Sequence, residues 1–521
     1  MAMYRKVLAG CFGLAAMVVG ACAPMTDFVT LDEKAFSQAQ ATEVFAAAYG
    51  GVADKYIDPV NVRDIAFEGI RGLGAIDPGL TIQENGATIV LSDSGRKITS
   101  FETPKADDVK GWAELTAKIS SAAREESAEM KSTDMETIFE AVFDGMLSNL
   151  DIFSRYAGAQ EAERNRSKRD GFGGIGIRYR VRDGIPVITE VLKKTPAAKS
   201  GLRKDDRITH VDATPLSGLS RHEISRKLRG PTHTRVELTV ARGDNPAPVI
   251  IAMERAHIFA ATVEHSTKDG IVYFKVKSFN QDTARSLAEK LRKARLDLGD
   301  GMKGMVIDLR GNPGGLLKQS VKVADLLLTQ GQIVSTRGRH ADSIHHYEAS
   351  GRDLADGLPL VVLVDGKSAS AAEIVAAALQ DRDRAVVIGT TSFGKGSVQT
   401  VLRLPNDGEI TLTWSRLIAP SGYMFHGLGI RPAICTSGVK GAARDAIKKG
   451  FANRSKTEET FVAWRQPGLR VEPKRSQLRA TCPSQRRRDD FEMQVARQVL
   501  NDQALYNRAL TFTAATNEAR Y

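Results

Sequence analysis

Strands and helices alternate along residues 270–434, and this alternation constrains the fold more than any other feature of the 521-residue sequence. Strands are expected at residues 272–276, 305–309, 360–364 and 385–388. Helices are expected between them at residues 283–296, 316–327 and 371–380. Such alternation predicts a largely parallel α/β sheet with helices packed on its faces.

The other regions have different periodicities, so the sequence predicts a multi-domain protein of α+β and α/β type. The N-terminal region is mainly helical, with a β-hairpin insertion near residues 80–98. Residues 106–129 are charged and rich in alanine, which favours a surface helix or a linker. A small domain of short strands precedes the α/β core, and a basic, helical extension follows it. The expected segments are 1–21, 22–165, 170–245, 255–434 and 435–521.

Residues 1–21 have the features of an export signal. Arg5 and Lys6 precede an apolar run that is too short to span a bilayer comfortably, and small residues follow before Cys22. The tetrapeptide that ends at Cys22 resembles a bacterial lipobox, in which the cysteine is acylated. We therefore expect an exported protein on the periplasmic side of the cell envelope, anchored to a membrane through Cys22. Ordinary signal cleavage is the alternative.

Two cysteines remain for the folded protein if Cys11 leaves with the signal and Cys22 carries lipid. Cys435 and Cys482 are therefore candidates for a disulfide in an oxidising compartment. Two unpaired thiols are the alternative.

Composition excludes several classes of protein. With 42% hydrophobic and 26% charged residues, the chain is neither a disordered polymer nor a polytopic membrane protein. The net charge of +11 is spread along the chain, so no nucleic-acid partner is expected. His345 and His346 lack a helical ligand spacing, so we assign no metal, and no cofactor is expected.

Ser370 stands where the expected strand at residues 360–364 leads through small residues into a helix. A serine at the positive end of a helix lies near free backbone N–H groups, which can hold an oxyanion. Ser370 and Glu373 also fit a Ser-x-x-Glu capping box, which needs no catalysis. A nucleophile elbow centred on Ser368 is a weaker alternative, because its last glycine is missing.

Lys395 lies in a Gly-rich segment over residues 389–397. This segment resembles a phosphate-binding loop, but strands rather than a helix are expected after it, at residues 397–404 and 409–414. A helix leading away from Ser370 and a strand leading back would return the chain to the serine. Lys395 could then act as a general base, provided that burial lowers its pKa from about 10.4 to near 7 or 8.

A third motif runs from Asp308 to Gly315. It begins at the end of a strand and forms a Gly-rich turn, whose N–H groups can approach a ligand closely because no Cβ intervenes. An ordinary strand-to-helix turn is the alternative.

Together the three motifs resemble the carboxy-terminal processing peptidases, also called tail-specific proteases. The resemblance implies a serine endopeptidase that acts through an acyl-enzyme, with Ser370 as nucleophile and Lys395 as general base. It implies that Gln399 orients the lysine. The N–H groups of Gly315 and Ala371 would form the oxyanion hole.

The resemblance extends to the small β domain and covers roughly residues 135–434. The run Gly174-Ile175-Gly176-Ile177 looks like the carboxylate-binding loop of a PDZ domain, in which successive N–H groups hold a peptide's terminal carboxylate. Proteins or peptides with accessible C-termini are the implied partners, and an oligomer is possible. The alternative function is a catalytically silent PDZ scaffold that binds peptides in the cell envelope.

One segment departs from the family pattern. Leu150-Asp-Ile152-Phe153-Ser154 stands where the family usually has Leu-Asp-Pro-His-Ser. The resemblance therefore does not carry the role of that histidine over to this chain.

Overall fold

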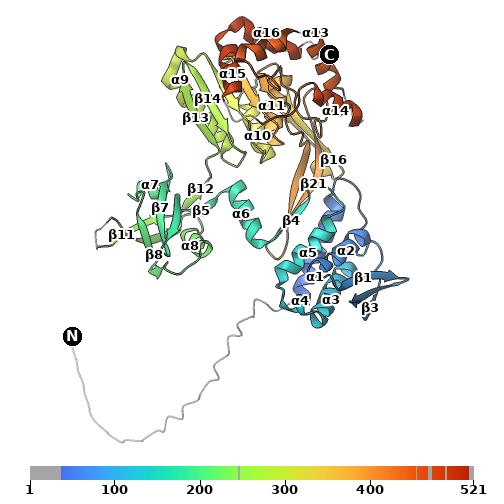
Figure 1. The fold of residues 1–521 in the computed structure, drawn as a ribbon. Coiled ribbons are helices and arrows are strands. Elements are labelled where there is room, and N and C mark those ends of the chain that lie inside the picture. The colour runs from blue at the N-terminus through green and yellow to red at the C-terminus, as the bar shows by residue number, and fades with distance from the viewer. Residues whose placement is uncertain (1–36, 244–246, 453, 467–471, 487–489, 515–521) are drawn as a thin grey trace, which may run out of the picture.

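The protein is described by a computed structural model that covers residues 37–243, 247–452, 454–466, 472–486 and 490–514 (Figure 1). The expected signal segment and Cys22 lie outside these ranges. Within them, every helix is too short or too polar to cross a membrane. A helical N-terminal region, a small β domain, an α/β core and a C-terminal set of helices follow one another, as the sequence predicts.

The N-terminal region is a helical bundle with a small sheet. Its helices are α1 (Gln38–Lys55), α2 (Val62–Arg71), α3 (Val109–Glu126), α4 (Ala128–Ser132) and α5 (Met135–Leu147). The insertion has three antiparallel strands, β1 (Leu80–Asn85), β2 (Thr88–Asp93) and β3 (Arg96–Glu102), one more than a hairpin. Helix α3 buries Trp112 and Ile119 completely, so the interpretation as a surface helix or linker was wrong.

The small β domain is an antiparallel sheet with one longer helix. The strands are β6 (Ile177–Arg182), β7 (Ile185–Val191), β8 (Arg207–Val211), β9 (Thr214–Pro215), β10 (Arg235–Ala241) and β11 (Val249–Glu254). Their order, β11-β10-β8-β7-β6, leaves β6 at one edge of the sheet. Helix α8 (Arg221–Leu228) packs on the sheet through Ile224 and Leu228. A short pair, β5 (Phe172–Gly174) with β12 (Ala256–Ile258), joins the domain to the core.

The core sheet has the order β13-β14-β15-β18-β19-β22. Its strands are β13 (Val263–Lys268), β14 (Ile271–Val276), β15 (Gly304–Asp308), β18 (Leu360–Val364), β19 (Val386–Gly389) and β22 (Ile434–Cys435). Only β13 is antiparallel, which agrees with the predicted, mostly parallel sheet. Helices α9 (Thr283–Leu298), α10 (Leu317–Asp325) and α11 (Ala371–Asp381) cover one face.

The C-terminal extension covers the opposite face of this sheet. It contains α12 (Ala443–Ala452), α13 (Arg454–Trp464), α14 (Glu472–Ala480), α15 (Phe491–Asn501) and α16 (Gln503–Ala514). Val495 and Val499 of α15 belong to the same buried cluster as Val306 and Val361 of the central strands. A parallel sheet must be buried on both faces, so these helices complete the core.

A second sheet lies between the core and the N-terminal bundle (Figure 1). Its strands are β16 (Gln332–Gly338), β17 (His345–Glu348), β20 (Ser397–Arg403) and β21 (Glu409–Ile418), and β21 also pairs with β4 (Arg155–Ala157). Helix α6 (Ala159–Asp170) leads from β4 to the small β domain. The second sheet therefore links the core to both neighbouring regions.

Candidate active site

The three sequence motifs follow the carboxyl ends of three adjacent parallel strands, β15, β18 and β19. The carboxyl edge of a parallel sheet is where ligands bind in α/β proteins, because the loops that follow the strands meet there. The fold therefore brings the segments of Gly315, Ser370 and Lys395 to one edge.

Ser370 is half-buried and stands directly before α11, a helix in which every residue is buried. It forms the capping box with Glu373 that the sequence suggests, and Glu373 Oε2 accepts its N–H at 2.8 Å. Capping does not explain its backbone, which has φ +56° and ψ −114°. A serine in this region is strained by about 1–3 kcal/mol, and such strain concentrates at functional sites.

Ser368 does not fit the nucleophile-elbow alternative. Its side chain is completely buried, and its hydroxyl donates to the carbonyl of Leu309 at 2.9 Å. The same hydroxyl accepts the N–H of Asp365 at 2.9 Å. Ser368 therefore holds two loops together and has no access to a substrate.

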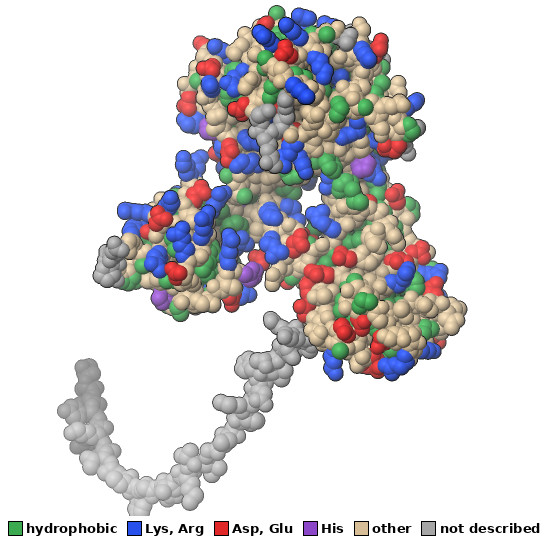
Figure 2. All heavy atoms as spheres, viewed as in Figure 1, with side chains coloured by type: hydrophobic (Ala, Val, Ile, Leu, Met, Phe, Trp, Pro, Cys, Tyr) green, Lys and Arg blue, Asp and Glu red, His purple; other side chains and the backbone are tan. Residues whose placement is uncertain are grey.

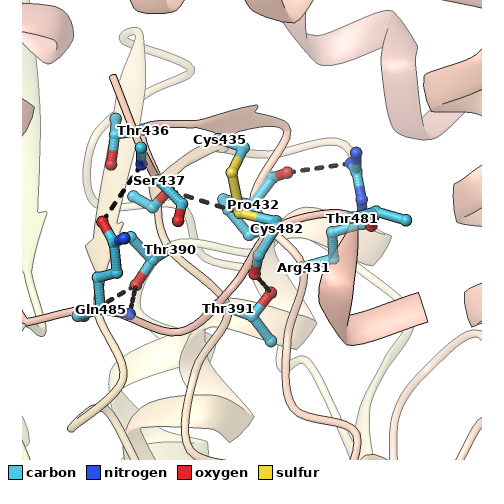
Figure 3. Close-up of a disulfide and its surroundings, with 12 residues drawn as sticks. Thr390, Thr391, Arg431, Pro432, Cys435, Thr436, Ser437, Thr481, Cys482 and Gln485 are labelled. Atoms are coloured by element: carbon cyan, nitrogen blue, oxygen red, sulfur yellow. Dashed lines mark hydrogen bonds between the residues drawn. A yellow bond between two sulfur atoms is a disulfide. The ribbon is translucent and has the colours of Figure 1, made fainter. Parts of the chain in front are cut away.

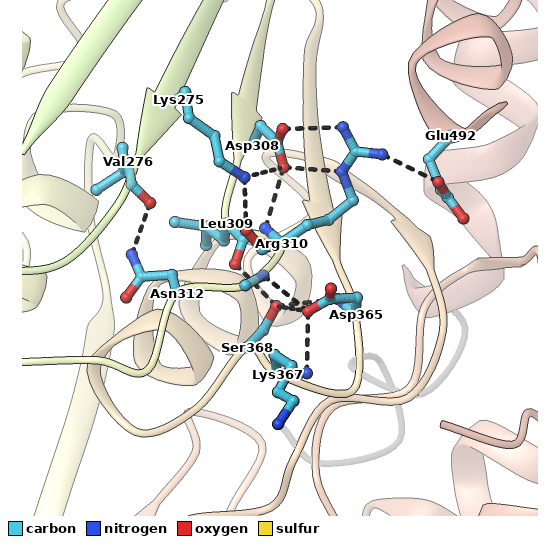
Figure 4. A network of polar contacts seen from close by, with 11 residues as sticks. Lys275, Val276, Asp308, Leu309, Arg310, Asn312, Asp365, Lys367, Ser368 and Glu492 are labelled. Atoms are coloured by element: carbon cyan, nitrogen blue, oxygen red, sulfur yellow. Dashed lines mark hydrogen bonds and ion pairs between the residues drawn. The ribbon is translucent and has the colours of Figure 1, made fainter. Parts of the chain in front are cut away.

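A polar network fixes the turn that carries Gly315 (Figure 4). Arg310 forms ion pairs with Asp308 at 2.9 Å and with Glu492 of α15 at 3.0 Å. Asp365 accepts the N–H of Gly311 at 2.9 Å. Asn312 joins both sides of the turn, because its side chain donates to Val276 O and its carbonyl accepts the N–H of Ala369. The polar residues of this motif position the backbone of the loop.

The turn packs directly on the serine. A Cβ on Gly314 would lie 2.9 Å from Cβ of Ser370, so only glycine fits this contact. Gly315 has φ +143°, which also requires glycine. Within the ranges that the structure describes, the N–H groups of Gly315 and Ala371 donate to no protein acceptor. Both predicted oxyanion-hole donors are therefore free beside Ser370.

The carboxylate of Glu373 joins the serine segment to the lysine segment. It is completely buried and accepts four hydrogen bonds. The donors are the N–H groups of Ser370 (2.8 Å), Gly394 (2.7 Å) and Lys395 (2.9 Å), and the hydroxyl of Ser392. Because one oxygen, Oε2, accepts from both Ser370 and Lys395, these two backbones lie side by side.

This contact also removes the phosphate-loop alternative. The N–H groups of Gly394 and Lys395 point at Glu373, and the strand β20 follows the loop where a phosphate site would need a helix. Burial raises the pKa of Glu373 to about 7, while its four donors favour the ionised form.

Lys395 is half-buried, and its amine lies 4.7 Å from the centre of the Phe153 ring. Burial lowers the pKa of Lys395 below its ordinary value, and Arg155 lowers it further. Asp151 and Glu373 oppose this shift. In the described residues no hydrogen bond joins the amine to the Ser370 hydroxyl, an arrangement that is common in free enzymes, where catalytic contacts tighten on substrate binding.

Gln399 lies on β20, four residues beyond Lys395. Its side-chain amide donates to Ser397 Oγ at 2.9 Å and to Thr413 Oγ1 at 3.3 Å. Thr413 Oγ1 in turn donates to Asp151 at 3.1 Å. Gln399 thus joins a hydrogen-bond network that ends at Asp151, whose charge acts on Lys395. The orientation of Lys395 by Gln399 stays a prediction.

The small β domain has a groove of about 570 Å³ between β6 and α8. Its lining includes the four predicted residues Gly174, Ile175, Gly176 and Ile177. The N–H groups of Ile175 and Gly176 donate to no acceptor in the described part of the chain. Gly176 has φ +86°, and a Cβ there would overlap Thr195. A free turn beside a free strand edge suits a peptide that ends there.

Comparisons with known proteins assign families to the α/β core and to the small β domain. The family model "Peptidase family S41" matches residues 270–436, and the model "PDZ domain" matches residues 187–242. A carboxy-terminal-processing protease of Bartonella bacilliformis is 39% identical over 303 residues, which span 58% of this chain and 70% of that protein. This chain belongs to peptidase family S41.

Two further relatives of this S41 peptidase extend the comparison. The "Probable CtpA-like serine protease" of Staphylococcus aureus is 32% identical over 308 residues, or 58% of this chain and 61% of that protein. A solved structure of the photosystem II D1 C-terminal processing protease matches 75% of this chain and 92% of its own, with 23% identity and a TM-score of 0.38. The two family models and the two curated relatives show a serine peptidase with a PDZ domain.

Two contacts in the site of this S41 peptidase could not be predicted from the sequence. Glu373 matched a local capping box, but its contacts with the Lys395 loop come from residues about 20 positions away and leave no local pattern. Phe153 was seen only as a departure from the family motif. The only sequence signal for its position next to the lysine is the replacement of the family's usual histidine by an aromatic residue.

Proposed function

We propose that this S41 peptidase captures protein C-terminal tails in its PDZ groove and cleaves the bound chain with a Ser370–Lys395 dyad. The observation that carries the proposal is the shared carboxylate of Glu373, which accepts N–H groups from both residues. The free N–H groups of Gly315 and Ala371 support the oxyanion hole.

The chemistry follows from these positions. The neutral amine of Lys395 takes the proton of the Ser370 hydroxyl as Oγ attacks the scissile carbonyl carbon. Negative charge then develops on the carbonyl oxygen, where the N–H groups of Gly315 and Ala371 stabilise it. The resulting ammonium gives its proton to the leaving amine as the C–N bond breaks, which leaves an ester on Ser370. Water, deprotonated by Lys395, then hydrolyses the ester and restores both residues.

Substitution of either residue tests the dyad. We expect Ser370→Ala and Lys395→Ala each to lower the turnover of a denatured protein substrate at least about a thousand-fold, because the dyad acts as a unit. Lys367→Ala is the matched control, since Lys367 is exposed three residues before Ser370. Melting curves should show all three variants folded.

The opposite result would be hydrolysis retained by either purified dyad variant. If the unmodified protein binds C-terminal peptides but releases no product, it is instead the silent PDZ scaffold.

We also propose that the peptidase works in the cell envelope, lipid-anchored through Cys22. The disulfide between Cys435 and Cys482 supports an oxidising compartment. Cells given radiolabelled palmitate should label the protein, and Cys22→Ala should remove the label. A labelled Cys22→Ala variant, or an unlabelled unmodified protein, would contradict the anchor.

A further inference from the structure

The groove beside β6 has a charge pattern that the proposed function does not use. Residues 171–255 contain 16 Lys and Arg against 9 Asp and Glu, a net charge of +7, so the positive charge is less evenly spread than the sequence analysis expects. Figure 2 shows Lys and Arg side chains gathered over this lobe. The charged residues that line the groove are Arg178, Arg180, Glu190, Arg221 and Arg229.

The two ends of the groove differ. Arg229, directly after α8, lies 4.0 Å from the ring centre of Phe172, so the C-terminal end of α8 stands at the carboxylate-binding turn. At the start of α8, the carbonyl of Arg221 accepts the hydroxyl of Tyr179 at 3.1 Å, opposite the middle of β6. A tail that ends at the turn therefore passes Arg221 on its way in.

Strand addition determines which tail residues meet which side chains. A tail that runs antiparallel to β6, with its last residue beside Ile177, places the residue two positions earlier beside Tyr179. Ile177 packs on the domain core and Leu228 is buried at the same end, so the last residue meets an apolar surface. The residue two positions before the last one meets a polar surface.

Tyr179 closes the bottom of the groove at that second position. Its hydroxyl lies 2.6 Å from Oγ of Ser225, a contact that spans from β6 to α8. A side chain at this point of the tail cannot descend between strand and helix, so it is directed to the rim. Arg221 stands on that rim and is exposed.

Two of the four arginines have no acidic partner. Arg178 pairs with Glu190 at 3.2 Å, and Arg229 pairs with Glu163 of α6 at 3.5 Å. Arg180 and Arg221 form no ion pair with any residue that the structure describes. Both are exposed and both are among the residues that line the groove.

We infer that the PDZ groove selects tails with an apolar last residue and an Asp or Glu two residues before it, paired with Arg221. Arg180, on the opposite face of β6, favours a second acid at a neighbouring tail position. This inference rests on the proposed capture of tails, but it goes further by naming the class of tail.

The test uses the full chain with Ser370→Ala, so that bound peptides stay intact. Fluorescent ten-residue peptides ending in leucine carry Glu, Gln or Lys two residues before the end. A fourth carries Glu six residues before the end, and a fifth is the first peptide with an amidated C-terminus. We expect Glu at the near position to bind about three- to fivefold more tightly than Gln, and Lys to bind most weakly, with differences that shrink in high salt.

Two variants test whether the preference for the Glu peptide depends on Arg221. Arg221→Gln should remove the difference in affinity between the Glu and Gln peptides, mainly by weakening binding of the Glu peptide. Arg226→Gln is the matched control, because Arg226 is exposed on α8 but does not line the groove. Equal binding of the three near-position peptides, or of the near and far Glu peptides, would overturn the inference. Tight binding of the amidated peptide would instead overturn tail capture itself.

Discussion

At the scale of single residues, the site depends on two ionisable groups that burial shifts in opposite directions. Burial raises the pKa of Glu373 and lowers the pKa of Lys395, so both shifts favour the neutral forms. The four donors around Glu373 need its carboxylate ionised, and the dyad needs Lys395 uncharged. Deprotonation of either group favours catalysis, so activity should rise with pH through and above neutrality.

Phe153 has two opposite effects on the pKa of Lys395, and two different substitutions separate these effects. Its ring covers the amine, which disfavours the ammonium form, and its π face attracts the ammonium by about 0.5–1 kcal/mol. Phe153→Leu keeps the cover without the π face, so the pKa of Lys395 should fall and the alkaline rise of kcat/KM should move about half a pH unit lower. Phe153→Ala admits water, so the rise should move higher.

The pH profile of kcat/KM for the two variants checks this prediction. Phe67→Leu, in the N-terminal bundle, is the control and should not move the profile. A profile that stays in place in both Phe153 variants would show that this ring does not set the proton affinity of the lysine.

At the scale of elements, a segment over residues 478–485 supports the loop that leads to Lys395. It is tied by the disulfide between Cys435 and Cys482, whose Cα atoms are 6.0 Å apart (Figure 3). The carbonyl of Cys482 accepts the hydroxyl of Thr391 at 2.6 Å. The carbonyl of Gln485 accepts the N–H of Gly366 at 2.9 Å, in the turn before Ser370. One segment of the C-terminal extension therefore supports both catalytic loops.

Removal of this disulfide should weaken the core and the site together. Cys435→Ala with Cys482→Ala opens a loop with a sequence separation of 47 residues, which predicts a loss of about 2–4 kcal/mol in the free energy of unfolding. We expect kcat to fall as well, with peptide binding by the PDZ groove unchanged. Urea unfolding and turnover, with and without reductant, check this.

Cys22→Ala, which removes a cysteine outside the residues that the structure describes, is the control for the loss of a thiol in the purified protein. Unchanged unfolding and unchanged kcat after complete reduction would contradict a supporting role for the segment.

The elements that could be predicted from sequence are those with regular apolar patterns. Strand β18 alternates between the two buried clusters and was predicted at its observed bounds. Helix α6 was not predicted, because only Ala162 is buried on it and ion pairs hold it in place. The role of the C-terminal helices was also missed, since covering the second face of the sheet is a tertiary property.

At the scale of the whole molecule, α6 connects the catalytic core to the PDZ domain. Glu409 of β21 is almost completely buried and pairs with Arg166 at 3.1 Å and Arg169 at 3.0 Å. The backbone carbonyl of Arg169 also accepts the N–H of Gln281 in the core. On its other side, α6 contacts the PDZ domain through Glu163 and Arg229. The position of α6 therefore affects how the two domains sit together.

Neutralising Glu409 should release α6 from the core. Burial alone would raise the pKa of Glu409, but Arg169 and Arg166 hold it below its ordinary value. The ionised Glu409 carboxylate therefore stabilises the folded state above about pH 4.5. This contribution is lost as the pH falls through the folded-state pKa of Glu409. Glu409→Gln should cost about 1–3 kcal/mol, because it leaves two partly buried guanidinium groups without a counter-charge.

Hydrogen exchange of α6 measures this release. Exchange should accelerate in Glu409→Gln at pH 7, and in the unmodified protein only below about pH 4.5. Glu161→Gln, an exposed substitution on the same helix, is the control. Equal protection of α6 in the Glu409 variant and the unmodified protein would contradict the account.

The most direct test of the dyad is to trap the covalent intermediate. The enzyme is mixed with an unfolded protein substrate, quenched in acid within the first turnover and mapped by mass spectrometry. We expect an acyl group on the hydroxyl of Ser370, present in the unmodified enzyme and absent in Lys395→Ala. An acyl group on another residue, or full hydrolysis in a Ser370→Ala enzyme, would contradict it.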